Sequence, residues 1–161
     1  MASLKFNSVG PILEEGVSAV TATPSVEVGV RRTYLGEEYV YCFNAGTGTL
    51  SQKMVAKLIT GASGYSVAAT AATDVFSPAV GVVKHADIAA SSYGWVMTKG
   101  FATVSPISAL TADYVILACG ASGSVIQWAA TGPTQGVAIG YGLGVNTAAA
   151  GDLYAYIRTG F

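Results

Sequence analysis

Charged residues are scarce in this chain. Only 11% of its 161 residues are charged and 52% are hydrophobic, whereas a typical soluble domain is about 25% charged. A monomer so poor in charge would expose much apolar surface and would tend to associate with itself. The composition therefore indicates either a membrane protein or a subunit that buries part of its surface in an assembly.

Long hydrophobic runs are also missing. A membrane-spanning helix needs roughly 20 consecutive apolar residues, and glycine, serine and threonine interrupt every apolar stretch of this sequence. Strands of alternating polarity also occur in membrane barrels, but the strand-like segments here are short and irregular. We therefore expect no contact with a membrane, and an assembly subunit accounts better for the composition.

The charge balance and the cysteines limit the partners and the cellular compartment that we expect for the protein. A net charge of −1 offers no basic footprint for nucleic acid. The opening MASLKFNSVG lacks the apolar core of a signal peptide, so we expect a protein made and kept in a cytosol. Cys42 and Cys119 are then free thiols. Each lies in an apolar, strand-like run, and we interpret both as small buried side chains.

Side chains that carry chemistry are few. His85 is the one histidine, and no nucleophile motif accompanies it and Asp87, so we expect it at a surface turn. One histidine and two distant cysteines do not make a metal site. The glycine clusters at 45–50 and 140–144 lack the spacing of nucleotide-binding loops. We predict no enzyme activity, no catalytic residues, no metal and no cofactor.

Short apolar runs between clusters of Gly, Ser and Thr predict an all-β fold. We expect a single β-sandwich or β-barrel domain of about eight to ten short strands with an irregular N-terminal arm. The expected strands are 26–34, 38–44, 73–83, 93–104, 113–119, 124–130, 136–145 and 153–161. The turn GASG at 120–123 predicts a hairpin. Residues 50–59 fit either a short helix or a further strand.

Alternation along the strands assigns their faces. In the segment 38–44 the aromatic odd positions are expected on one side and the even positions Val40 and Cys42 on the other. In the segment 93–104, Trp95 and Met97 are expected to face the core. Trp128 is expected to be at least half buried.

Two segments of the chain resemble each other. Residues 79–101 and 138–161 each read as a strand, an Ala-rich link and a second strand that ends in Gly-Phe, with odd positions facing inward. We interpret them as a possible internal repeat of two strand pairs that share one core, although apolar alternation alone produces part of the match. In either case the last strand is expected to hold the C-terminus in the sheet.

The first 25 residues differ from the rest, because they show no period and contain two prolines. We predict an arm over 1–25 and a β-rich domain over 26–161. A disordered tail is one interpretation of the arm, and a segment that orders against a partner is the other. The second is favoured by isolated apolar residues, to which we assign partner contacts: Leu4, Phe6, Ile12 and Leu13.

The stretch GVVKHADIAASSYGWVMTKGFATV at 81–104 resembles small head decoration (cement) proteins of tailed bacteriophages. The likeness lies in a Gly-Val strand, an Ala-rich link, YGWV, and KG before a strand of small residues. LGEEYVYCFNAGTGTL upstream and LTADYVILACGASGSVIQWA downstream extend it to about residues 26–130. This chain is longer than the shortest such proteins and adds a C-terminal strand pair.

The resemblance implies a structural virion protein on the outer surface of an icosahedral head, made in the host cytoplasm. It implies the major capsid protein as a partner, self-association into a homo-oligomer, commonly a trimer, and an arm that engages the capsid lattice. A protein that binds the closed shell and not its dissociated parts stabilises the shell by mass action. The alternatives are a trimeric receptor-binding or fibre-head β-module of a virion and a carbohydrate-binding β-domain.

Overall fold

The computed structural model describes most of the body of the chain. It covers residues 16–59, 64–70, 79–110, 112–128, 138–144 and 151–160, and the backbone of two short strands at 6–7 and 10–11. The all-β prediction is confirmed: these residues form twelve strands and, apart from the short 3-10 turn η1 (Ala121–Gly123), no helix. Within the described ranges, no helix has the length and apolar character needed to cross a membrane.

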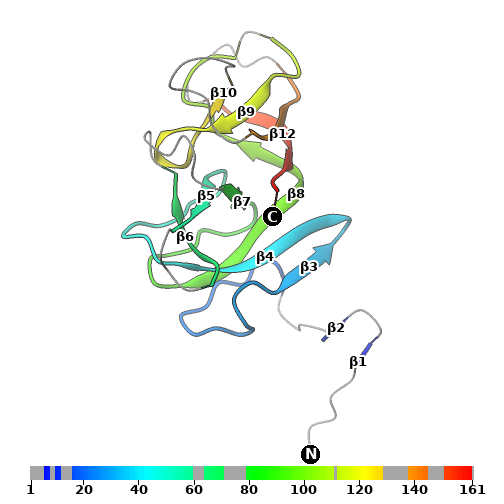
Figure 1. Ribbon diagram of the computed structural model, residues 1–161, viewed down its shortest axis with the longest axis vertical. Helices are drawn as coiled ribbons and strands as arrows, with labels where there is room; N and C mark the ends of the chain where they lie inside the picture. Colours follow the sequence, from blue (N-terminus) through cyan, green and yellow to red (C-terminus); the bar gives the residue numbers. More distant parts are fainter. Residues whose placement is uncertain are drawn as a thin grey trace, which may run out of the picture.

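Figure 1 shows how the strands are arranged in space. They are β1 (Phe6–Asn7), β2 (Gly10–Pro11), β3 (Arg31–Tyr34), β4 (Glu37–Asn44), β5 (Val55–Leu58), β6 (Ser66–Ala69), β7 (Ala79–Val82), β8 (Tyr93–Val104), β9 (Ile116–Cys119), β10 (Val125–Gln127), β11 (Ala138–Gly142) and β12 (Leu153–Arg158).

Ten of these strands form one sheet, and part of that sheet closes into a barrel. The hydrogen-bonded order is β10-β9-β11-β12-β8-β7-β5-β6-β4-β3, and β8 also pairs with β4. This last pairing closes β4, β6, β5, β7 and β8 into a five-stranded barrel. Strands β4 and β6 are parallel, whereas β4 and β8 are antiparallel. Strands β1 and β2 form a separate two-stranded sheet.

Strand β8 connects the barrel to the rest of the sheet. Its residues Tyr93–Lys99 pair with β4, and its residues Lys99–Val104 pair with β12. Figure 1 shows β8 running from the barrel, beside β4, to the region that holds β9, β10 and β12. Strand β8 thus pairs first with β4 and then with β12, and at Met97 it also pairs with β7, opposite Val82.

Strand β4 separates two hydrophobic clusters, as the alternation of its side chains predicts. Val40 and Cys42 belong to a cluster that takes members from all five barrel strands and so fills the barrel. Tyr39 and Tyr41 belong to the other cluster, which also contains buried residues of β9, β11 and β12. The two faces expected for this strand are therefore confirmed.

The tryptophan predictions are also confirmed. Trp95 is 4% exposed and Met97 is fully buried, both in the cluster outside the barrel. Trp128 is intermediate in burial, which is at least half buried. In β8, however, Phe101 is 42% exposed, so the expectation that odd positions face inward is wrong at this residue. Beyond Lys99 the strand leaves β4, and its even positions Ala102 and Val104 are the buried ones.

The first expected strand, 26–34, is shorter than the alternation predicted. Only Arg31–Tyr34 is a strand, because Gly29 at a φ of +97° turns the chain just before it. The amide of Val30 donates to the carbonyl of Glu27 at 3.2 Å, which closes this turn. Val30 nevertheless continues the pairing with β4, since its carbonyl accepts the amide of Tyr41 at 2.9 Å.

Three other segments refine the expected elements. Residues 50–59 contain strand β5 and no helix, since Lys53 adopts a φ of +74° in the turn that precedes it. Strand β6 was not predicted, because its Ser, Val and Ala residues show no alternation of polarity. Of the expected strand 73–83, residues 79–82 form β7, and 73–78 lie outside the described residues.

The expected hairpin and the C-terminal strand are both present. Strands β9 and β10 pair in antiparallel fashion across η1, with Cys119 opposite Val125. Strand β12 ends at Arg158, and the buried Thr159 then donates its hydroxyl to the carbonyl of Val80 at 2.7 Å. The end of the chain is thus tied to the barrel, while Phe161 lies outside the described residues.

Candidate functional site

The side chains predicted to contact a partner lie almost entirely outside what the structure describes. Leu4, Ile12 and Leu13 are outside the described residues, and Phe6 is described only as part of the backbone of β1. Their contacts stay a prediction.

The second part of the predicted arm packs on the barrel. Val17 is 4% exposed and belongs to the cluster outside the barrel. Thr21 exchanges two backbone hydrogen bonds with Tyr93, at 3.1 and 2.8 Å. Its hydroxyl also lies 3.0 Å from the hydroxyl of Tyr41, which the hydroxyl of Ser25 contacts at 3.2 Å. Residues 16–25 therefore pack beside Tyr41 of β4 and Tyr93 of β8.

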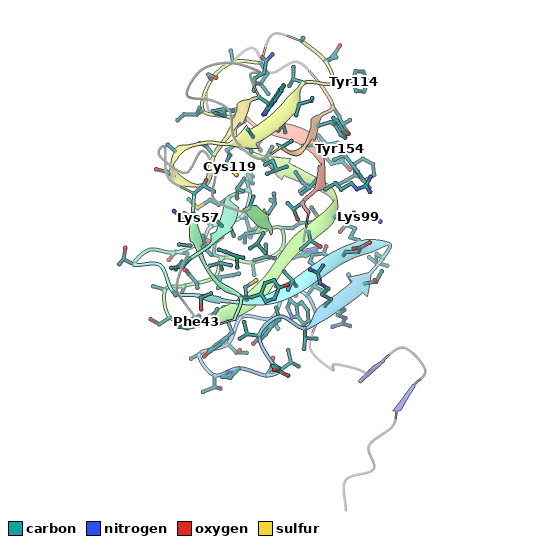
Figure 2. All side chains as sticks on the ribbon, in the orientation of Figure 1. Phe43, Lys57, Lys99, Tyr114, Cys119 and Tyr154 are labelled. Atoms are coloured by element: carbon teal, nitrogen blue, oxygen red, sulfur yellow. The ribbon has the colours of Figure 1, made fainter. Side chains whose placement is uncertain are left out.

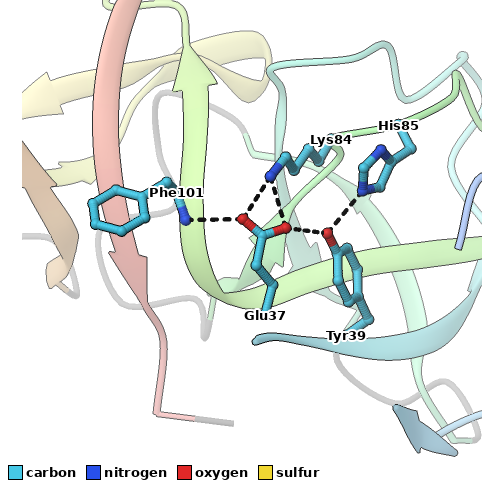
Figure 3. A network of polar contacts seen from close by, with 5 residues as sticks. All are labelled: Glu37, Tyr39, Lys84, His85 and Phe101. Carbon is cyan, nitrogen blue, oxygen red and sulfur yellow. Dashed lines mark hydrogen bonds and ion pairs between the residues drawn. The ribbon is translucent and has the colours of Figure 1, made fainter. Parts of the chain in front are cut away.

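A polar network joins three elements of the barrel (Figure 3). Glu37, at the start of β4, receives the Lys84 ammonium at 2.6 and 2.7 Å and the backbone amide of Phe101 at 3.3 Å. The buried Tyr39 hydroxyl donates to the Glu37 carboxylate at 2.5 Å and lies 2.7 Å from His85 Nε2. The network thus connects β4, the segment after β7, and β8.

The hydrogen bonds determine the protonation of the network. The Tyr39 hydroxyl has one proton, which the carboxylate of Glu37 accepts, so His85 must donate from Nε2. Burial opposes the ionisation of Glu37, but hydrogen bonds from Lys84 and Tyr39 outweigh it and lower the pKa of Glu37. Burial, followed by the charge of Lys84, lowers the pKa of His85, which favours the neutral imidazole.

This network is a structural clamp. The Tyr39 side chain is 1% exposed, and its hydroxyl is hydrogen-bonded to both Glu37 and His85. The expectation of a surface position for His85 is only partly right, because the ring is intermediate in exposure and bonded to a buried partner. Asp87 does not join it, since its carboxylate accepts the amide of Gln52 at 2.7 Å.

A row of four large side chains, three of them exposed and Tyr156 partly buried, crosses four strands. Phe101 on β8 lies opposite Tyr156 on β12, Tyr156 opposite Tyr141 on β11, and Tyr141 opposite Ile116 on β9. Directly opposite residues of an antiparallel pair share one face. We name Phe101, Tyr156, Tyr141 and Ile116 the aromatic row; Tyr141 is 50% exposed and Phe101 42%.

Tyr154 extends the aromatic row along β12 and projects from the body (Figure 2). It is 54% exposed, and its ring lies parallel to that of Phe101, with centroids 5.7 Å apart and 7° between the planes. Tyr156 meets Phe101 edge-on at 5.1 Å. Contiguous exposed apolar surface marks interaction sites in soluble proteins. The alternation of 153–158 contained this signal, but the sequence alone does not say which face of the strand is open to solvent.

The described residues offer little else for chemistry. No group of three or more His, Cys, Asp or Glu residues lies close enough to hold a metal ion among them. Cys42 is buried and Cys119 is partly buried, and the two do not form a disulfide. Burial raises the pKa of Cys42, which keeps this thiol protonated and unreactive.

Comparisons with known proteins place the fold. No protein-family model matches the chain, and a search of curated proteins finds no match either. Among solved structures, the fold is similar to the crystal structure of the head fiber gp8.5 N base in bacteriophage phi29, with a TM-score of 0.51 and 12% sequence identity. The match covers 74% of this chain and 94% of that chain. At this identity the likeness concerns the fold.

Proposed function

We propose that this chain is a structural protein of a bacteriophage virion that attaches to the outer surface of the head. The observation that carries the proposal is the fold likeness to a phage head fibre base, which extends over 94% of that protein. The low charge and the exposed aromatic row support it, because both suit a subunit that covers part of its surface in an assembly.

Two forms of this role differ in their effect on the shell. In the first, the protein is a decoration or cement protein that bridges neighbouring capsomers of the major capsid protein. At a free concentration 100 times its Kd, a protein that binds only the closed shell stabilises it by about 2.7 kcal/mol per site. In the second, favoured by the described likeness to a fibre base, the protein anchors an appendage and leaves the shell no more stable.

The test uses shells of the encoding phage that lack this protein. Purified full-length chain should co-sediment with them, and a decoration protein should also raise their melting temperature in calorimetry. Binding without a shift in melting favours the fibre base. The absence of any binding to intact shells would contradict both forms of the role.

The arm and the oligomer provide finer tests of the same proposal. We propose that residues 2–15 engage the capsid or a neighbouring subunit by strand addition, and that the free protein is a trimer of 16.3 kDa chains. A deletion of 2–15 keeps Val17 and Thr21 and should therefore still fold. It should co-sediment less well than a full-length control. Light scattering gives the mass of the free protein, and a species of one chain would contradict the trimer.

A further inference from the structure

A pocket opens beside the aromatic row, where β8 and β12 meet the segments that precede β5 and follow β7. Its volume is about 230 Å³. The residues that line it include Gln52, Lys53, Lys84, Phe101, Thr103 and Tyr154. We propose that this pocket binds a neutral sugar residue of a glycan, with Phe101 and Tyr154 as its aromatic wall. This inference concerns a ligand and does not depend on the virion role.

The aromatic wall suits the apolar face of a sugar ring. Phe101 and Tyr154 are 42% and 54% exposed, and their planes differ by only 7°. The face of an aromatic ring carries negative potential, which attracts the polarised C–H groups of a pyranose. Tyr156 packs edge-on against Phe101 at 5.1 Å and fixes the orientation of its ring.

The polar side of the pocket is nearly neutral. Lys53 contacts both carboxylate oxygens of Asp152, at 2.9 and 2.8 Å, and Lys84 contacts both oxygens of Glu37, at 2.6 and 2.7 Å. Each cation is thus matched by one carboxylate. A phosphate or an acidic sugar would gain little net attraction here and would compete with the carboxylates for the two ammonium groups.

The same arrangement suits hydroxyl groups, which both donate and accept. The ammonium groups of Lys53 and Lys84 present charged donors to the pocket, and hydrogen bonds to charged groups are about twice as strong as neutral ones. Gln52 and Thr103 add an amide and a hydroxyl to the wall. Ammonium, amide and hydroxyl groups beside two exposed aromatic rings match a neutral polyhydroxylated ligand better than a purely apolar one, and the carboxylates paired with Lys53 and Lys84 weaken the attraction for an anion.

The walls of the pocket are held before any ligand binds. The backbone amide of Phe101 donates to Glu37, and Tyr39 and Lys84 hold that carboxylate in place. The amide of Gln52 donates to Asp87 at 2.7 Å, which fixes the turn that carries Lys53. Such preorganisation lowers the entropic cost of binding.

The experiment screens the purified, folded chain against an array of neutral hexose-terminated and acidic oligosaccharides. The neutral oligosaccharide with the strongest signal is then titrated by calorimetry. We expect Phe101→Ala and Tyr154→Ala each to weaken its binding about tenfold, the loss expected for one stacking contact. Phe101→Tyr keeps the ring and should retain binding. Tyr141→Ala is the matched control, because Tyr141 is equally exposed on the aromatic row but does not line this pocket.

Four outcomes would overturn the inference. Two concern the ligand: no binding to any neutral glycan, or binding to acidic glycans alone with a strong salt dependence. The third is an equal loss of glycan affinity in Tyr141→Ala and Tyr154→Ala. The fourth is a change of oligomer mass in Phe101→Ala without any glycan affinity. The last would identify the aromatic row as a surface for a second copy of the chain. If Phe101→Ala failed to fold, Tyr154→Ala would decide, since this side chain is more than half exposed. The virion role is tested with shells, so the two proposals can fail separately.

Discussion

Strands β7 and β8 and strands β11 and β12 form two antiparallel pairs with different surroundings. All four residues of β7 are buried, and β8 is buried on both faces where it pairs with β4. In β12, buried and more exposed residues alternate, and in β11 Tyr141 is exposed. The first pair is therefore scaffold between two hydrophobic clusters, while the second keeps one face for contact with solvent or a partner.

Each pair contains a glycine that lies against the backbone of its partner strand. A Cβ at Gly81 would lie 2.0 Å from the carbonyl oxygen of Met97, and a Cβ at Gly140 would lie 2.1 Å from that of Tyr156. Similar local packing thus occurs in the closed barrel and in the open part of the sheet. What differs between the pairs is the set of elements that cover them, and that difference decides which pair can bind a partner. An internal repeat that relates 79–101 to 138–161 stays a prediction.

The largest change in the free energy of unfolding is expected for a residue of the buried pair, β7 and β8. Trp95→Ala removes a side chain that is 4% exposed, and truncation of a buried Trp costs about 3–5 kcal/mol. Tyr141→Ala on the open face should change the free energy of unfolding by no more than about 0.5 kcal/mol. Urea denaturation measures both. Similar losses for the two variants would mean that the open face of β11 is covered in the folded protein.

The two glycines should respond alike despite their different surroundings. Gly81→Ala and Gly140→Ala each force a Cβ into a backbone carbonyl, and overpacking of this kind costs about 1–3 kcal/mol or more. Gly140 also has a φ of +156°, which an alanine adopts only with strain. Gly144→Ala is the control, because nothing lies within 4 Å of a Cβ there. A neutral Gly140→Ala would show that the pairing of β11 with β12 is looser than that of β7 with β8.

Removal of the Tyr39 hydroxyl from the clamp should lower the free energy of unfolding. Tyr39→Phe leaves Glu37 and His85 without their shared partner, and the loss of such a buried partner costs about 1–3 kcal/mol. Tyr154→Phe removes an exposed hydroxyl from the open pair and should be neutral in the same urea titration. If Tyr39→Phe were also neutral, the network would not contribute to the stability of the barrel.

The smallest effect should be a dependence of stability on pH. The folded-state pKa of His85 is lowered from 6.5, so the unfolded chain takes up a proton first and stability falls as the pH drops below about 6.5. Glu37, whose pKa is lowered from 4.5, adds a second loss below about pH 4.5, as it is protonated in the folded state. Urea midpoints from pH 8 down to about pH 2 measure both steps. His85→Gln should remove the upper step, and an unchanged profile would contradict the assignment.

Much of the fold was accessible from the sequence. Strand β8 was predicted at 93–104, the residues that it occupies, because its alternation is long and its ends are marked by turn residues. The faces of β4 and the burial of Trp95 follow from the two-residue period of a strand. Strand β6 escaped prediction because its short run of small residues carries no period, and its parallel pairing with β4 depends on a contact between distant segments.

The candidate sites were far less accessible. Glu37, Tyr39, Lys84 and His85 come from two segments almost 50 positions apart, and no local pattern joins them. The pocket likewise brings together Gln52, Phe101 and Tyr154, from three separate segments. The sequence did not identify the exposed tyrosines, since alternation separates the two faces of a strand but does not say which face is covered.

The sequence by itself determined the class of the fold, the period and extent of its clearest strands, and the low charge that favours assembly. These properties are local or compositional, because a strand period depends on neighbouring residues and a charge count depends on none. Only the tertiary structure decided the closure of the barrel through β4 and β8, the clamp around Tyr39, and the exposure of the aromatic row. Burial of a strand face depends on what packs against it, and those partners are distant in the chain and brought together only when the sheet closes.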